Sequence, residues 1–160
     1  MKLINKFLLC IGLLFLVGTI SVFSFADEKN DIYKDDNKIV QQGDNYTFEN
    51  KIGARISSNE IDIKYSGFSG TNTIWLLEVK EDGELSLNFD STVDNGEFKM
   101  VLINSQKEIE SILEGTEQGN KAIKLTKGKY VIKIVGRNAA GKIMVSINKN
   151  QNIEITKVDK

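Results

Sequence analysis

The sequence contains no histidine and no proline, and its one cysteine, Cys10, lies in the first apolar run. Without histidine the chain lacks the usual general base near neutral pH and a common metal ligand. Because no cysteine follows residue 26, zinc sites of the common kinds and disulfides are both excluded from the rest of the chain. The stability of that part must therefore come from packing and strand pairing.

The sequence also has no large excess of acidic or of basic residues. The chain has 21 basic and 22 acidic residues, and beyond residue 26 the balance is 19 to 22. Nucleic-acid binding requires a clustered basic face, and electrostatic docking to a membrane requires a basic segment. The near-neutral balance argues against both partners.

The first 26 residues have the pattern of an export signal. Lys2 and Lys6 precede an uncharged apolar run from Phe7, and Ser24-Phe25-Ala26 places small residues where a signal peptidase cleaves. We therefore predict a signal peptide over 1–26 and a secreted or envelope-associated protein. An uncleaved anchor is the alternative, because about 20 apolar residues can span a bilayer, and it would be the protein's only membrane attachment. Lipidation of Cys10 is disfavoured, since apolar residues continue after it.

The remainder divides into a polar leader and one domain. Residues 27–44 mix acidic and basic side chains with few apolar ones, which predicts a flexible leader with an edge strand around 38–41. Residues 45–160 are long enough for a single domain with a core.

From residue 46 onward the apolar residues alternate with polar ones. This period of two is typical of strands with one buried face. Six runs show it: 52–56, 61–65, 85–89, 98–102, 130–134 and 143–147. A seventh stretch, 73–79, is apolar on both faces, so its outer side is either covered or a binding surface. Residues 106–113 have a helix-like apolar spacing, but their position between two hairpins favours a strand.

Turn sequences separate these runs. Asp-Gly and Asn-Gly pairs tolerate the positive φ of tight hairpin turns. We expect turns at 81–84, 94–96, 104–107, 127–129 and 138–141, with a loop at 115–119. Frequent turns between short strands predict an all-β fold, an antiparallel β-sandwich of about nine strands.

Two segments resemble a known family. Residues 123–136, with Gly128-Lys129-Tyr130 at their centre, and residues 141–147 are similar to the last strands of bacterial pre-peptidase C-terminal-like domains. The strand from Asp82 to Phe89 fits the same pattern, whereas the Asp-x-Tyr-x-Phe element of those domains is absent. The chain also resembles small secreted proteins of low-GC Gram-positive bacteria. These resemblances imply a secreted jelly-roll sandwich and no particular activity.

Trp75, Tyr65 and Phe68 are the candidate ligand-binding residues. Aromatic rings provide large contact areas for a sugar or a peptide at low entropic cost. The alternative, which large aromatic residues favour in general, is that Trp75 packs in the core between two sheets.

Asp90, Asp94, Asn95 and Glu97 are the candidate metal ligands, because hard oxygen donors close together can hold Ca²⁺. Their spacing matches no fixed calcium loop, and Asp and Asn also favour turns by bonding their own backbone. No other cofactor is indicated. A group of lysines at 121, 124, 127, 129 and 133 could meet an acidic polymer, but a solvated strand face explains it better.

These features favour a non-catalytic binding module that recognises a cell-wall glycan or an extracellular protein. A structural protein that self-associates through an exposed strand edge is the second hypothesis. A hydrolase with paired carboxylates, such as Asp90 and Glu97, is the third.

Overall fold

Three strands of twenty or more residues dominate the structure. The computed structural model describes residues 29–53, 57–148 and 151–158, so the predicted signal peptide lies outside the described residues, as do Ala54 and Ile56 of the first alternating run. The elements, in chain order, are η1 (Asp31–Lys34), α3 (Asp36–Ile39), β1 (Asn45–Thr47), β2 (Asn50–Ile52), β3 (Glu60–Val79), β4 (Gly83–Asn104), β5 (Ile109–Glu114), β6 (Glu117–Leu125), β7 (Gly128–Ile147) and β8 (Ile153–Lys157).

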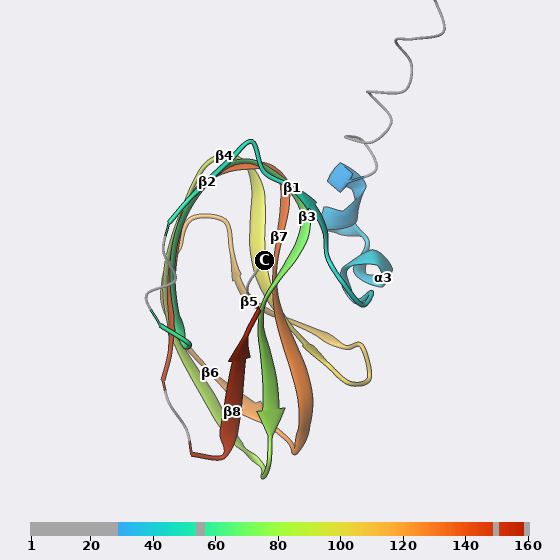
Figure 1. Ribbon diagram of the computed structural model, residues 1–160, viewed down its shortest axis with the longest axis vertical. Coiled ribbons are helices and arrows are strands. Elements are labelled where there is room, and N and C mark those ends of the chain that lie inside the picture. Colours follow the sequence, from blue (N-terminus) through green and yellow to red (C-terminus); the bar gives the residue numbers. More distant parts are fainter. Residues whose placement is uncertain (1–28, 54–56, 149–150, 159–160) are drawn as a thin grey trace, which may run out of the picture.

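The long strands β3, β4 and β7 each contribute to two layers. In the first layer, hereafter layer 1, the order is β2, β3 (60–66), β7 (141–147), β4 (83–93) and β6. In layer 2 the order is β8, β3 (75–79), β7 (128–135), β4 (98–104) and β5, and β1 pairs with β3 between the two halves. All pairs are antiparallel. Figure 1 shows the long strands curving from one layer into the other. The all-β antiparallel sandwich predicted from the sequence is confirmed.

Bulges mark the places where the strands pass between layers. The register of β4 against β7 shifts between Val93 and Glu97, and Asn95 lies opposite Ala140. Strands that change sheets commonly do so at such bulges. The predicted hairpin turns at 94–96 and 138–141 are therefore wrong. Both sequences lie inside continuous strands, and the described residues contain eight strands where about nine were predicted.

The remaining turn predictions agree with the structure. β3 ends at Val79 and β4 begins at Gly83, while β6 ends at Leu125 and β7 begins at Gly128. The turn after Asn104 leads into β5, which confirms a strand in the segment 106–113. The loop predicted for 115–119 is shorter, because β6 already begins at Glu117.

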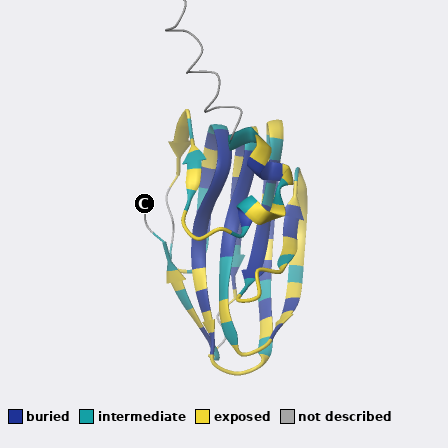
Figure 2. Ribbon diagram, turned by 90° about the vertical axis from the view of Figure 1, so that its right-hand side faces the viewer, coloured by how far each residue is buried: buried dark blue, intermediate teal, exposed yellow. Residues whose placement is uncertain are grey.

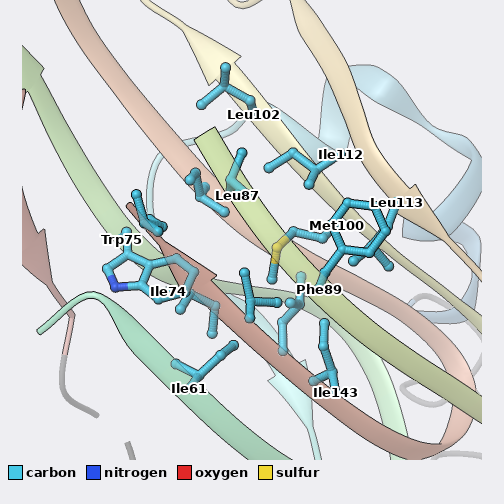
Figure 3. Packing of buried hydrophobic residues seen from close by; sticks show 14 of the residues in the cluster. Ile61, Ile74, Trp75, Leu87, Phe89, Met100, Leu102, Ile112, Leu113 and Ile143 are labelled. Atoms are coloured by element: carbon cyan, nitrogen blue, oxygen red, sulfur yellow. The ribbon is translucent and has the colours of Figure 1, made fainter. Parts of the chain in front are cut away.

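The main core fills the space between the layers. Burial alternates in the layer 1 halves of the long strands, over 61–65, 85–90 and 143–147 (Figure 2), as the sequence pattern predicts. Side chains from both layers meet in Figure 3, with Ile61, Leu87 and Ile143 coming from layer 1 and Trp75 and Met100 from layer 2. Among the described residues, no helix combines the length and apolar character needed to cross a membrane.

The leader packs against the outer face of layer 2 and contains helix rather than the predicted edge strand. Asp35 caps α3, since its carboxylate accepts hydrogen bonds from the backbone N–H groups of Asn37 and Lys38. A second apolar cluster joins the leader to β4 and β7; it consists of Ile32, Tyr33, Ile39, Val101, Ile103 and Val135. The outward positions of these strands are apolar because the leader covers them.

Candidate functional site

The outer face of layer 1 carries two rows of polar side chains. The first row crosses four strands in the order Glu60, Ser146, Asn88 and Asn120, as the strand register aligns them. The second, two residues further along each strand, contains Asp62, Met144, Asp90 and Gln118. Because side chains alternate across a strand, these residues point away from buried neighbours such as Ile61, Phe89 and Val145.

The two rows border a hollow on this face. It has a volume of about 480 Å³ and is lined by Glu60, Asn88, Asp90, Gln118, Asn120, Met144 and Ser146, together with Phe89, Gly119 and Val145. With strands spaced about 4.8 Å apart, a row across four strands extends over about 14 Å. The hollow can therefore accommodate an extended ligand that lies across the strands.

The side chains of the hollow include both donors and acceptors of hydrogen bonds. The carboxamides of Asn88, Gln118 and Asn120 donate and accept, and the Ser146 hydroxyl does the same. Carboxylates at Glu60 and Asp90 accept only. Met144, whose side chain is 37 % exposed, provides an apolar and polarisable contact among them. This set suits a ligand rich in hydroxyl groups that also has an apolar C–H surface.

A salt bridge limits the negative charge at one side of the hollow. The Lys142 ammonium lies 3.5 Å from a carboxylate oxygen of Asp62. Both side chains are at least one-third exposed, so the pair contributes little to stability. The pair nevertheless keeps the Lys142 ammonium beside the second row.

The three aromatic candidates lie in the core instead of on this face. Trp75 and Phe68 are completely buried and Tyr65 nearly so. The Trp75 indole N–H donates a hydrogen bond of 2.9 Å to the Ser58 carbonyl. The interpretation of these rings as an exposed stacking platform is therefore wrong in this structure, and the core alternative describes them.

Tyr65 and Phe68 belong to a buried aromatic group where β3 changes layers. Tyr65 stacks on Phe98 with ring centroids 4.9 Å apart, and Phe68 stacks on Phe48 at 4.4 Å. The Tyr65 hydroxyl is buried and has no hydrogen-bond partner among the described residues. Burial raises the pKa of Tyr65 well above its usual value, and the nearby negative charge of Asp94 raises it further.

The four candidate calcium ligands serve separate roles. Asp90 belongs to the second polar row, whereas Glu97 forms an ion pair with Arg137. The Asn95 side chain donates a hydrogen bond of 3.2 Å to the Asn138 carbonyl and so connects the two bulges. Among the described residues, no group of three or more His, Cys, Asp or Glu side chains could hold a metal ion. These contacts do not support a calcium site, and the Asp90–Glu97 pair stays a prediction.

Lys133 does not belong to the solvated lysine face in which the sequence placed it. Its side chain is 3 % exposed, and its ammonium donates hydrogen bonds to the carbonyls of Ile39, Gln41 and Gly43 at 3.1, 2.7 and 3.0 Å. Lysines 124, 127 and 129 are exposed, as that interpretation requires.

Of the residues of the hollow, the sequence analysis singled out Asp90 alone, and for calcium or hydrolysis instead of glycan binding. The alternation in 85–89 and 143–147 does assign Asn88 and Ser146 to a solvent face, because their neighbours in the sequence are apolar. What the pattern does not contain is the register that places Asn120 and Glu60 in the same row.

No protein-family model matches this sequence, and no curated protein sequence matches it. The resemblance to pre-peptidase C-terminal-like domains therefore has no support from either comparison. Solved structures with a similar fold include a carbohydrate-binding module of Cellvibrio mixtus lichenase 5A in complex with cellotriose. It has 11 % sequence identity and a TM-score of 0.40, and the alignment covers 67 % of this chain and 91 % of that one.

Two further structures show the same general likeness. A family 35 carbohydrate-binding module from Cellvibrio japonicus is 8 % identical, with a TM-score of 0.37 and coverage of 71 % and 81 %. A family two carbohydrate esterase from Clostridium thermocellum, in complex with cellohexaose, is 14 % identical at a TM-score of 0.37. In that case the alignment covers 74 % of this chain and 34 % of the esterase. At these identities the likeness concerns the β-sandwich alone.

Proposed function

We propose that this protein is a non-catalytic binding module that takes a glycan chain on the outer face of layer 1. The observation that carries the proposal is the pair of polar rows around the hollow of about 480 Å³. The residues come from four neighbouring strands, whose hydrogen bonding fixes their spacing. A rigid array of this kind loses little conformational entropy on binding.

The chemistry of the rows favours a glycan over other ligands. Each sugar hydroxyl both donates and accepts hydrogen bonds, and carboxamides such as those of Asn88 and Asn120 can satisfy both requirements. The Met144 side chain offers an apolar contact for the C–H groups of a sugar ring. No aromatic ring lies in these two rows, so hydrogen bonding supplies the selectivity.

The compartment follows from the sequence. An export signal over residues 1–26 would deliver the module to the outside of the cell or to the envelope. Cell-wall glycans are the abundant polyhydroxylated polymers there, and we therefore propose one of them as the partner.

A double variant tests the proposal. Isothermal titration with soluble wall glycans, including peptidoglycan fragments and β-glucan oligosaccharides, should show binding to the wild-type protein. Asn88→Ala/Asn120→Ala should weaken that binding at least about tenfold, because each lost hydrogen bond contributes about 1 kcal/mol.

The matched control removes two exposed polar side chains away from the hollow, in Asn37→Ala/Gln106→Ala. This variant should bind as the wild type does. Equal binding by both double variants would refute the assignment of the site, and a wild-type protein that binds no glycan of the panel would refute the function.

A further inference from the structure

Ile52 is an apolar side chain on the surface of layer 1. It is 68 % exposed, more than the other large apolar side chains exposed in the described residues, Leu76 and Met144. A large aliphatic side chain that stays in water does not contribute the favourable free energy of burial to stability. Ile52 belongs to strand β2, which pairs with β3 at one edge of layer 1.

Lysines lie beside Ile52 on the same face. The register aligns Ile52 with Lys64 of β3, and Lys64 in turn with Lys142 of β7. Both lysines are exposed. The β2 edge of the molecule thus presents an isoleucine next to positive charge.

A cleft opens on the opposite side, between β5 and β6. Its volume is about 450 Å³, and Leu102, Ile109 and Leu125 provide its apolar part. Glu108 and Glu110 stand on the β5 side of this cleft, and Lys124 and Thr126 on the other side. The side chain of Lys121 joins β6 to β5 nearby, where its ammonium lies 3.4 Å from a Glu110 carboxylate oxygen.

The cleft exists because β5 and β6 belong to different layers. Each pairs with β4, β6 with its first half and β5 with its second half. Within the described part of the chain, neither strand has a second partner, so both leave an edge available. Exposed edges of this kind invite association with another chain.

We infer that the protein self-associates head to tail, with the Ile52 edge of one copy seated in the β5–β6 cleft of the next. Ile52 supplies the apolar group that the cleft can bury. Lys64 brings positive charge toward Glu108, which stands on the β5 side of the cleft, whereas Lys124 lies on the opposite side. β2 and β6 lie at opposite edges of layer 1, and a bound pair of copies therefore still presents one unused Ile52 edge and one unused cleft.

This geometry gives open chains rather than closed dimers. A contact between two different surfaces of the same molecule propagates unless a rotation closes the ring. Ile52, Lys64 and Lys142 lie next to the polar rows on the same face but belong to neither row, so the inference extends the proposed function without resting on it.

Sedimentation velocity over a concentration range from about 10 µM to 1 mM tests the inference. The sedimentation coefficient of the wild type should rise continuously with concentration. Ile52→Asp should weaken the association at least about tenfold, because it would bury a charge in an apolar cleft. Ile52→Ser provides a second variant with less effect on the local strand, and Leu76→Asp is the matched control at another exposed apolar position.

A complementation experiment distinguishes head-to-tail contact from a symmetric one. Glu108→Lys/Thr126→Trp reverses the charge at the cleft and fills it, so this variant alone should be monomeric. Mixed with Ile52→Asp, whose cleft is intact, it should form dimers that do not grow further.

Three results would overturn the inference: a wild type that remains monomeric, an Ile52→Asp variant that associates like the wild type, or a mixture that stays monomeric. Asn88→Ala/Asn120→Ala should associate like the wild type, which separates this result from that of glycan binding.

Discussion

The ammonium nitrogen of Lys133 lies 2.7 Å from the carbonyl oxygen of Gln41, although 92 positions separate the two residues in the chain. Two further carbonyls, of Ile39 and Gly43, accept hydrogen bonds from the same group. A buried strand lysine thus binds the end of α3 and the residues after it. The Asp44 carboxylate adds a second attachment, since it accepts hydrogen bonds from the backbone N–H and the hydroxyl of Thr73 at 2.8 and 2.6 Å.

Replacement of Lys133 should release the leader from layer 2. Lys133→Met leaves three carbonyls without their donor, and we expect the free energy of unfolding to fall by about 3 kcal/mol. Urea denaturation measures the change, and limited trypsin digestion should show faster cleavage after Lys34 and Lys38. Lys129→Met, on an exposed position of the same strand, should leave both measurements unchanged. Equal stability of the two variants would contradict the role assigned to Lys133.

Gly96 should tolerate no side chain. Its φ is +73°, and a Cβ there would lie 2.3 Å from the Asn138 carbonyl oxygen. Gly115 has nearly the same φ, +71°, but open space around it. We therefore expect Gly115→Ala to cost about 1 kcal/mol for the backbone alone and Gly96→Ala at least about 2 kcal/mol more. Thermal unfolding of the two variants measures this difference in stability. Similar losses of stability would show that the β4 and β7 backbones can move apart at the bulges.

Removal of the Tyr65 hydroxyl should stabilise the protein. The hydroxyl is buried without a partner in the described part of the chain, so Tyr65→Phe eliminates an unpaired polar group while the ring stays stacked on Phe98. We expect an increase of about 1 kcal/mol at pH 7. A decrease of similar size would show that the hydroxyl has a favourable interaction in solution.

The same variant should be less sensitive to alkaline pH. Burial raises the pKa of Tyr65 in the folded protein above the value near 10 of the unfolded chain. Above that pH the unfolded state loses its proton first, so the free energy of unfolding decreases as pH rises. Tyr33 is shifted in the same direction, by burial first and then by its hydrogen bond to Glu114. Denaturation curves from pH 8 upward should fall less steeply for Tyr65→Phe than for the wild type.

The fluorescence of Trp75 should report on the packing of the core and not on ligand binding. Since the ring is fully buried, its emission should be blue-shifted, and acrylamide should quench it only after unfolding. Glycan binding on the outer face of layer 1 should leave this quenching unchanged. Efficient quenching of the folded protein would place the ring at the surface and would reinstate it as a candidate ligand contact.

Alternation predicted the layers well because it depends on local chemistry. In 85–89 and 143–147, every second residue is apolar and buried, as the sequence pattern requires. Trp75 lies in the stretch 73–79, where the alternation breaks, so the pattern left open whether its outer side was covered. The general tendency of large aromatic residues to be buried favoured the core, and the ring is fully buried.

The turn-forming residues alone did not predict where the chain reverses direction. Gly96 of the Asn95-Gly96 pair adopts the positive φ that its composition indicates, but within a bulge that faces Asn138 of another strand. A glycine with positive φ occurs both in hairpin turns and in bulges, and only the pairing of β4 with β7 decides between them. The candidate site depends on the same pairing, so its rows could not be predicted from the sequence.

The continuity of β3, β4 and β7 through both layers has a mechanical consequence. In a sandwich whose layers are linked only by loops, the two sheets can slide or part while each remains intact. Here such a movement would have to break the hydrogen bonds of three strands at once, since β3, β4 and β7 are each paired with neighbours in both layers. The two faces of the molecule are therefore held at a fixed distance and orientation, and a load applied to one is transmitted directly to the other.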